Sequence, residues 1–417
     1  METRVPPAAS RADAERLDRR DRLALCRRRF VLPAGVVYLD GNSLGALPAT
    51  VAPRLERVIG REWGEQLVRS WNDPWIDVPR SVATKVARLL GADPADVVVA
   101  DSVSVNLFKL LAAALALRPE RRLVLVPEND FPTDVYVARG LAELLAGRAA
   151  VKAVAEAELA DHLDGDVAVL SLSHVDFKSG RRRDMAGLTA AAHACGALAL
   201  WDLSHSAGVL DLDLEAAGVD LAVGCGYKYL NGGPGAPSFL YVAPRHQERA
   251  RSPIWGWLGH ADYMAFEPAY RPAPGVERFS CGTWPILSLA AFDAALDAFD
   301  GADMGLVEEK AGALGGLLIE RLEQRCAAFP LEVVSPRDPA RRGAHVAVRH
   351  PQAYAVMQAL KARGVIGDFR TPDLMRFGLA PLYLRYADVW DAVEILHEVL
   401  ATASWDRPEH HRRQRIT

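Results

Sequence analysis

The chain has 417 residues, half of them hydrophobic and 24% charged, so it can bury a large core and is not expected to be disordered. A net charge of -4 gives it no attraction to nucleic acid or to an anionic membrane, and no apolar run approaches the roughly eighteen residues of a membrane span. Its five scattered cysteines lack any C-x-x-C pair, which indicates reduced thiols in a cytoplasmic protein, and no residue cluster has metal-ligand spacing.

The first ninety residues predict helices around one short strand. Residues 10–30 are rich in Arg, Asp and Glu, which is typical of a surface helix and not of a signal peptide. A turn with the sequence Gly41-Asn42-Ser43-Leu44-Gly45 follows the strand, and Pro48 is expected to open a helix. The expected elements are a helix within 10–30, a strand at 36–40, helices at 48–68 and 82–90, and a pocket-lining loop at 70–75.

From residue 96 onward, apolar strands alternate with helical stretches. This alternation predicts a largely parallel sheet covered on both faces, with ligand groups at the carboxyl ends of its strands. One long helix is expected after Pro285, followed by a smaller α+β unit and a polar tail. The expected strands are 97–100, 123–126, 167–172, 197–201 and 221–223, and the expected helices are 104–117, 134–145 and 185–195. The expected parts are an N-terminal helical segment at 1–35, a large α/β domain at 36–300, a small α+β domain at 301–405, and a tail at 406–417.

Two stretches carry the main chemical signal. Lys228 stands between two tyrosines, after an apolar run and before a glycine-rich loop. A lysine held in this way can form a Schiff base with a carbonyl compound. Asp202 ends a buried strand upstream, where a carboxylate can pair with a pyridinium nitrogen. The two together predict an enzyme that uses pyridoxal phosphate (PLP), although Lys228 could also be a solvated loop lysine and Asp202 a helix cap.

Two further stretches lie between a strand and a helix. The segment at 101–106 could bind a phosphate at the start of a helix, or its Ser and Asp residues could simply cap that helix. Phe131 could stack on a flat heteroaromatic ring with Asp134 as a polar partner, and the alternative is a hydrophobic staple with a first-turn acid. His174 is expected to be structural, and Arg181, Arg182 and Arg183 to form a solvated turn.

Taken in order, these motifs resemble those of kynureninase, in the aspartate-aminotransferase-like (fold type I) group of PLP enzymes. The resemblance extends from about residue 38 to residue 390. It implies a mostly parallel seven-stranded sheet between helices, a smaller C-terminal α+β domain, and a homodimer with shared active sites. The motifs that carry it are Leu39-Asp40-Gly41-Asn42-Ser43-Leu44-Gly45, Phe131-Pro132-Thr133-Asp134, Leu172-Ser173-His174-Val175, Trp201-Asp202-Leu203-Ser204-His205-Ser206-Ala207-Gly208, Tyr227-Lys228-Tyr229-Leu230-Asn231-Gly232-Gly233-Pro234-Gly235 and Pro381-Leu382-Tyr383.

The resemblance also implies roles for individual residues. Lys228 would carry the cofactor as a Schiff base, Asp202 would keep the pyridine nitrogen protonated, and Tyr227 would reach the phosphate. Trp257 and Thr283 would approach the phosphate from the second subunit, and Thr283 stands where some members have asparagine. The implied cofactor contacts are Val103, Ser104, Phe131, Asp134, Ser173, Asp202, His205, Tyr227, Lys228, Trp257 and Thr283, and the implied substrate contacts are Arg376, Trp71 and Ser43.

The implied reaction is the hydrolytic cleavage of L-kynurenine, or of 3-hydroxykynurenine, to alanine and the matching anthranilate. It would serve tryptophan breakdown or the synthesis of NAD precursors. Arg376 would bind the substrate carboxylate, with Arg370 as a nearby competitor. The alternatives are a kynureninase homologue for a substituted kynurenine, a cysteine desulfurase-like lyase with Cys281 as its nucleophile, and a PLP-binding protein without turnover.

Overall fold

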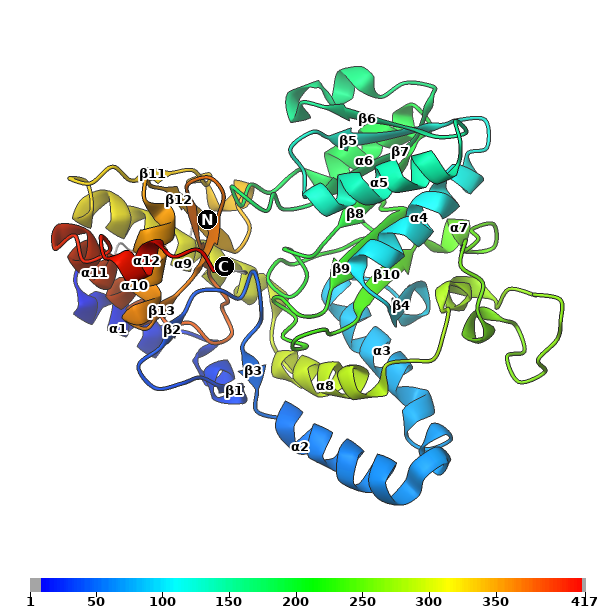
Figure 1. Cartoon of the computed structure of the whole chain (residues 1–417), viewed down its shortest axis with the longest axis horizontal. Coiled ribbons are helices and arrows are strands. Elements are labelled where there is room, and N and C mark those ends of the chain that lie inside the picture. Colours follow the sequence, from blue (N-terminus) through cyan, green and yellow to red (C-terminus); the bar gives the residue numbers. More distant parts are fainter. Residues whose placement is uncertain (1–8, 415–417) are drawn as a thin grey trace.

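A computed structural model describes residues 9–414 of the chain, and Figure 1 shows that they form two lobes of unequal size. The larger lobe holds a seven-stranded sheet, and the smaller lobe holds a four-stranded sheet together with both ends of the described chain. The outer ends of the expected N-terminal segment and polar tail, at 1–8 and 415–417, lie outside the described residues. The boundaries expected at 35, 300 and 405 stay predictions.

The large sheet has the strand order β4-β10-β9-β8-β7-β5-β6. Neighbours from β9 through β6 run parallel, while β10 is antiparallel to both β9 and β4, so the sheet is mixed but mostly parallel. Its strands are β4 (Val97–Ala100), β5 (Leu123–Pro127), β6 (Ala150–Val154), β7 (Val167–Ser173), β8 (Leu198–Asp202), β9 (Leu221–Cys225) and β10 (Ser238–Val242).

Helices bury both faces of this sheet, which explains why its strands are continuous apolar runs. Successive side chains of a strand point to opposite faces. In β8, Leu198 and Leu200 join a core cluster with α4 (Val103–Leu117) and α5 (Pro132–Leu144). Ala199 and Trp201 join the cluster on the other face, with α3 (Val78–Leu90), α6 (Met185–Ala194) and α8 (Ile286–Leu296).

The smaller lobe packs a sheet of order β11-β12-β15-β14 against helices, and the N-terminal segment joins it. Helix α1 (Arg11–Arg20) packs on α11, and strand β2 (Val37–Tyr38) pairs in parallel with β13 (Val365–Ile366). The remaining elements of this lobe are α9 (Met304–Arg325), β11 (Glu332–Val333), β12 (His345–Arg349), α10 (Ala353–Ala362), β14 (Asp368–Arg370), β15 (Leu374–Gly378), α11 (Tyr386–Ala401) and α12 (Pro408–His411).

Some sequence-based expectations about local structure are wrong. Pro48 does not open a helix, because Leu47–Pro48 forms a short strand, β3, that pairs with β1 (Phe30–Val31). Helix α2 (Val51–Arg57) starts three residues later and continues as a π-helix to residue 66. The expected single helix after Pro285 is interrupted at 297–303, so that α8 packs on α2 and α3 whereas α9 packs on α11. Strands β6 and β10 and the short helix α7 (Pro244–Gln247) were not expected.

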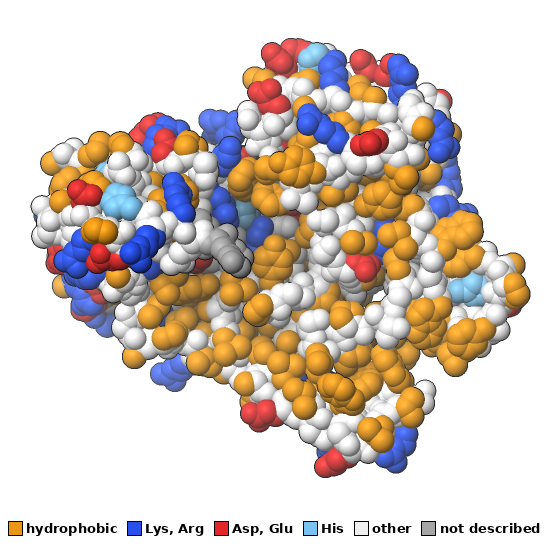
Figure 2. All heavy atoms as spheres, viewed as in Figure 1, with side chains coloured by type: hydrophobic (Ala, Val, Ile, Leu, Met, Phe, Trp, Pro, Cys, Tyr) orange, Lys and Arg blue, Asp and Glu red, His pale blue; other side chains and the backbone are white. Residues whose placement is uncertain are grey.

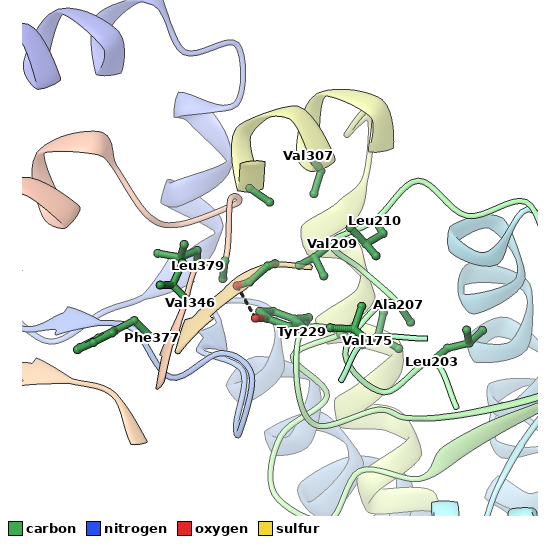
Figure 3. Packing of buried hydrophobic residues seen from close by; sticks show 14 of the residues in the cluster. Val175, Leu203, Ala207, Val209, Leu210, Tyr229, Val307, Val346, Phe377 and Leu379 are labelled. Carbon is green, nitrogen blue, oxygen red and sulfur yellow. Dashed lines mark hydrogen bonds between the residues drawn. The ribbon is translucent and has the colours of Figure 1, made fainter. Parts of the chain in front are cut away.

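The two lobes share one hydrophobic core (Figure 3). Tyr229, from the loop after β9, packs in the same cluster as Val346 of β12 and Phe377 of β15. Its phenol donates a hydrogen bond to the Ala344 carbonyl at 2.7 Å, drawn as the dashed line in Figure 3. The loop that carries Lys228 is therefore anchored to the smaller lobe one residue after the lysine.

Candidate active site

The loop after β9 holds Lys228 by backbone hydrogen bonds from two directions. The Asn231 N–H donates to the Lys228 carbonyl at 2.9 Å, and Asn231 adopts a left-handed φ of 59°, which asparagine tolerates. From the N-terminal segment, the Gly45 N–H donates to the Tyr227 carbonyl at 2.8 Å. The lysine is thus fixed between its own turn and the Gly41–Gly45 turn.

A cavity surrounds the Lys228 ammonium at the carboxyl ends of the parallel strands. The Nζ atom lies 5.8 Å from the centre of the Phe131 ring and 6.0 Å from that of Tyr227. Both rings are close enough for a cation–π contact. The cavity is lined by Val103, Phe131, Ser173, Val175, Phe177, Asp202, Ser204, His205, Tyr227 and Lys228.

Ser173 and Asp202 lie side by side because β7 and β8 are parallel and end together. The register pairs Ser173 with Asp202 directly. The Asp202 carboxylate accepts a hydrogen bond from the Ser204 N–H at 2.8 Å. Burial raises the pKa of Asp202, and the charge of Lys228 opposes this rise. The carboxylate is therefore buried, with a lysine as its nearby cation.

Asp134 adds a second buried carboxyl beside Asp202. It lies in the first turn of α5, three residues after Phe131, and one of its carboxylate oxygens, Oδ1, has no hydrogen-bond partner. Burial raises its pKa well above the usual value, and the neighbouring Asp202 adds to this rise. An unpartnered oxygen in a buried position is unfavourable unless a ligand supplies a donor or a cation.

The start of α4 forms another wall of the cavity. The first helical residue is Val103, and the Ser102 hydroxyl caps the helix by accepting from the Val105 N–H at 3.4 Å. Ser104 lies in the same first turn, although it is not among the residues that line the cavity. A helix start presents free N–H groups and favours a phosphate. Asp101, just before it, is held at a φ of 50° and contacts the fully buried Lys109 at 2.5 Å.

His205 is a neutral histidine at the cavity wall. Burial lowers its pKa well below the usual value, and the nearby charge of Lys228 lowers it further. Its Nε2 atom lies 3.1 Å from the Asn42 carbonyl oxygen, so in its neutral form it is expected to donate there. Tyr227 keeps its proton in a similar way, because burial raises the pKa of the phenol.

Arg376 approaches from the smaller lobe. It stands on β15, is buried, and reaches the cavity through Phe177, one of the residues that line it. Its guanidinium pairs with Asp368 of β14 and donates to the Phe177 carbonyl. Ser43 contacts the same pair, because its hydroxyl donates to Asp368 at 2.7 Å. The structure thus brings the predicted Ser43 and Arg376 together.

Three of the remaining predicted site residues, like Ser104, do not line this cavity within one chain. Trp71 packs edge-on against Trp75 at 5.2 Å, beside α8. Trp257 is 40% exposed, and Thr283 is exposed as well. None of the three is among the residues that line the Lys228 cavity.

Sequence reasoning missed several residues of the site and misplaced one. The expectation that Arg183 belongs to a solvated turn is wrong. Its side chain is buried, donates to the Ser173 carbonyl at 2.5 Å and pairs with Glu156 at 2.9 Å. Sequence reasoning did not single out Asp130 or Phe177, although each lies next to a motif that it did single out. Asp130 accepts a hydrogen bond from the Ser173 N–H at 2.8 Å, and Phe177 lines the cavity.

Two structural findings concern metal ions and membranes. Within residues 9–414, no group of three or more His, Cys, Asp or Glu side chains is arranged to hold a metal ion. Across the same residues, none of the helices is long and apolar enough to span a bilayer.

Cys281 is a half-buried thiol whose pKa is raised by burial, which makes it a poor nucleophile.

Solved structures of PLP enzymes have the same fold. A cysteine desulfurase from Thermococcus onnurineus NA1 aligns with a TM-score of 0.77 over 90% of this chain and 98% of its own, at 17% identity. A cystine C-S lyase in complex with cysteine persulfide aligns with a TM-score of 0.75 over 88% and 98%, at 19% identity. Identities this low show the fold alone, and they confirm the predicted fold class.

Comparison with sequences is more specific. The family model for the kynureninase C-terminal domain matches residues 307–396. The kynureninase of Pseudomonas fluorescens is 48% identical over 98% of this chain and 100% of its own length. The kynureninase of Burkholderia pseudomallei (strain 1106a) is 47% identical over the same shares. The predicted resemblance is confirmed, and the chain belongs to the kynureninase family.

Proposed function

We propose that this protein is a PLP-dependent kynureninase, which uses water to cleave the Cβ–Cγ bond of L-kynurenine into anthranilate and L-alanine. The observation that carries the proposal is a half-buried lysine, Lys228, in a cavity lined by the Phe131 ring and the Asp202 carboxyl, in a chain of this family. The reaction belongs to tryptophan breakdown and NAD precursor synthesis. Five free cysteines support a location in the reducing cytoplasm.

The residues of the cavity fit PLP. A flat ring can stack on Phe131, and the buried carboxyls of Asp202 and Asp134, one with an unpartnered oxygen, favour a protonated ring nitrogen and polar substituents. The start of α4, at Val103 and Ser104, favours the phosphate. Ser173, His205 and Tyr227 would complete the contacts that one chain makes with the cofactor.

The bound cofactor supplies an aldehyde that captures amines and a ring that accepts the electrons of a broken bond. Lys228 would hold the cofactor through its Nζ atom, and the freed amine would move the proton at the substrate α-carbon. Asp202 would hold a proton on the ring nitrogen. Tyr227, whose high pKa keeps its phenol protonated, can deliver a proton to the substrate β-carbon after the Cβ–Cγ bond breaks.

Substrate recognition would come from the smaller lobe and from the N-terminal segment. Arg376 would bind the α-carboxylate with its planar fork, and Ser43 lies within its reach at 3.4 Å. We propose that Trp71 borders the aryl ring of the substrate. A tryptophan there suits unsubstituted kynurenine better than 3-hydroxykynurenine, since its indole offers little to pair with an added hydroxyl.

We propose that the enzyme is a homodimer whose partner completes each site. Figure 2 shows hydrophobic side chains gathered over α8 and α2 and on the projecting loop to the right of the view. The exposed fractions are 66% for Trp255 and 72% for Phe266 on this loop, and 55% for Trp63 after α2. Exposed apolar surface of this kind indicates a protein contact. Trp71, Trp257 and Thr283 lie in the same region and would enter the cavity of the partner.

The activity is tested by adding L-kynurenine and, separately, 3-hydroxykynurenine to the PLP-loaded protein and following the release of alanine and of the aryl acid. Equal amounts of both products are expected, with the higher kcat/KM for L-kynurenine. Lys228→Ala should abolish turnover, and Lys152→Ala, at the far edge of the sheet beside His162, should not. Loss of cofactor absorbance without product formation would reject the kynureninase proposal.

The shared site is tested by mixing two inactive variants, Lys228→Ala and a Trp257→Ala/Thr283→Ala double variant. A mixed dimer would contain one site with Lys228 from one chain and Trp257 and Thr283 from the other, so activity should return. If all of these residues serve the same chain, no mixed dimer contains an intact site and the mixture stays inactive.

A further inference from the structure

The guanidinium of Arg376 is already held by protein groups. Its Nε atom donates to Asp368 Oδ1 at 2.8 Å, and its Nη2 atom donates to Asp368 Oδ2. Its Nη1 atom donates to the Phe177 carbonyl, and Nη2 also lies 3.4 Å from the Ser43 hydroxyl. Both side chains of the Arg376–Asp368 pair are 1% exposed, so water does not compete for these bonds.

Asp368 is itself fixed from three sides. Besides Arg376, it accepts a hydrogen bond from the Ser43 hydroxyl at 2.7 Å and pairs with Arg370 at 2.8 Å. Burial alone would raise the pKa of Asp368, but its hydrogen bonds and the charge of Arg376 outweigh burial and lower it. Asp368 is therefore a buried, ionised carboxylate between two arginines, and the three groups together carry one net positive charge.

The number of donors on arginine shows where a second carboxylate can bind. A guanidinium has five N–H groups, and Asp368 occupies the edge formed by Nε and Nη2. A fork with two parallel bonds remains only at Nη1 and the second Nη2 hydrogen. The Phe177 carbonyl and, more weakly, the Ser43 hydroxyl now lie at these two atoms. A substrate carboxylate must take the place of the Phe177 carbonyl.

The turn that carries Phe177 lies between the two lobes. The Asp176 carboxylate closes it by accepting from the Ser179 N–H at 2.6 Å. The Gly180 carbonyl accepts from Gly343 of the smaller lobe at 2.8 Å. On its other side, the Phe177 ring lines the cavity and packs edge-on against Phe131 at 5.2 Å. A shift of the Phe177 carbonyl would therefore be felt at the aromatic wall of the cofactor cavity.

We propose that Asp368 is the positioning residue of the carboxylate-binding arginine, and that the Phe177 carbonyl is a place-holder which the substrate carboxylate displaces. Asp368 holds the edge of Arg376 formed by Nε and Nη2, so that the fork formed by Nη1 and the second Nη2 hydrogen faces the cavity in every state of the enzyme. The neutral carbonyl holds this fork in the absence of substrate and yields to an anion, because a charged pair of parallel bonds is stronger than one bond to a carbonyl. This inference rests on the proposed role of Arg376 in binding substrate.

The first test compares Asp368→Asn with a matched control, Asp373→Asn. Asp373 lies in the turn between the same two strands and pairs with Arg349 on the surface. An amide at position 368 sets a donor against a guanidinium donor, so the fork loses its orientation. KM for L-kynurenine should rise about ten- to a hundred-fold, with a much smaller change in kcat. The affinity for L-alanine, read from cofactor absorbance, should fall by a similar factor, while that for ethylamine, which lacks the carboxylate, should not change.

A second readout, amide hydrogen exchange, needs no turnover. In the cofactor-free protein, Asp368→Asn should speed amide hydrogen exchange at residues 176–180, because Phe177 loses a fixed partner, and Asp373→Asn should not. In the PLP-loaded wild type, L-alanine should speed exchange at the same residues. If Asp368→Asn fails to fold, Ser43→Ala, which removes one bond to Asp368, should raise KM about two- to five-fold.

The outcomes separate this inference from the proposed function. A wild type that does not cleave kynurenine rejects the activity, yet the alanine, ethylamine and exchange measurements still decide the role of Asp368. If the wild type is active and Asp368→Asn matches Asp373→Asn in KM, in alanine affinity and in exchange, Asp368 is not a positioning residue. Equal losses of alanine and ethylamine affinity would point to general damage and would overturn the proposal as well.

Discussion

Replacing Gly45 by alanine should displace Lys228 while leaving the fold intact. A Cβ atom at position 45 would lie 2.3 Å from the Lys228 carbonyl oxygen and 2.6 Å from the Asn231 Cα atom. Unstrained contacts to carbon begin at about 3.5 Å, so the overlap is roughly 1 Å. Both atoms belong to the backbone, and no rotamer change can relieve the clash. The Gly41–Gly45 turn or the lysine loop must move by about this distance.

The expected magnitudes follow from that displacement. Overpacking of this kind lowers the free energy of unfolding by about 1–3 kcal/mol. The hydrogen bond from the Gly45 N–H to the Tyr227 carbonyl, now 2.8 Å long, would be lost or stretched. A misplacement of about 1 Å at a reacting group can lower the rate about a hundred-fold. We therefore expect kcat/KM for L-kynurenine to fall about a hundred-fold in Gly45→Ala, measured at full PLP loading.

Gly316→Ala is the matched control. Gly316 lies inside α9, where an added Cβ would meet nothing within 4 Å. Helix propensity then predicts a gain of up to about 1 kcal/mol in stability and no change in kcat/KM. An active Gly45→Ala enzyme with wild-type cofactor absorbance would refute the idea that Gly45 is required because of its close approach to the lysine loop.

Two further predictions concern stability. Tyr229→Phe should lower the free energy of unfolding by about 1 kcal/mol in denaturant titrations, because Ala344 loses one of two hydrogen bonds, whereas the 66% exposed Tyr136 should tolerate phenylalanine without loss. At Asp220, burial would raise the pKa, but hydrogen bonds, that of His246 foremost, outweigh it and hold the pKa below the usual value of about 3.9. This stabilisation is complete above about pH 4 and is lost as the pH falls through the lower pKa that Asp220 has in the folded protein. Below pH 4, the thermal midpoint of wild type should therefore fall more steeply than that of Asp220→Asn. Parallel curves for the two proteins would contradict this reasoning.

The sheet and the centre of the site could be predicted because both depend on local patterns. Strands buried on both faces appear as unbroken apolar runs, and β8 and β9 were recognised in this way. Ligand groups gather at the carboxyl ends of such strands, so Asp202, Phe131 and Lys228 were expected to meet, and they line one cavity. No long-range information was needed for that step.

What could not be predicted depends on partners that are distant in the sequence. Arg183 appeared solvated among neighbouring arginines, yet it is buried because Glu156, 27 positions away, neutralises it. The direction of β10 is set by its pairing with β4, far upstream in the sequence. Phe177 and Asp368 carry no motif of their own. Asp368 faces Arg376 across the pairing of β14 with β15, and the packing of one lobe on the other brings Phe177 to the same arginine.

The contacts between the lobes also restrict how the substrate can reach Arg376. A hinge opening of the smaller lobe would have to separate Tyr229 from Ala344, expose part of a continuous core and pull the Gly45 N–H from the loop of Lys228. Each of these changes would disturb the lysine itself. Release of the Phe177 carbonyl removes only one hydrogen bond to a neutral acceptor and leaves the Arg376–Asp368 pair in place. Local displacement of the Asp176–Gly180 turn is therefore a less costly route to the arginine than movement of the whole lobe, and it keeps Lys228 positioned while the substrate enters.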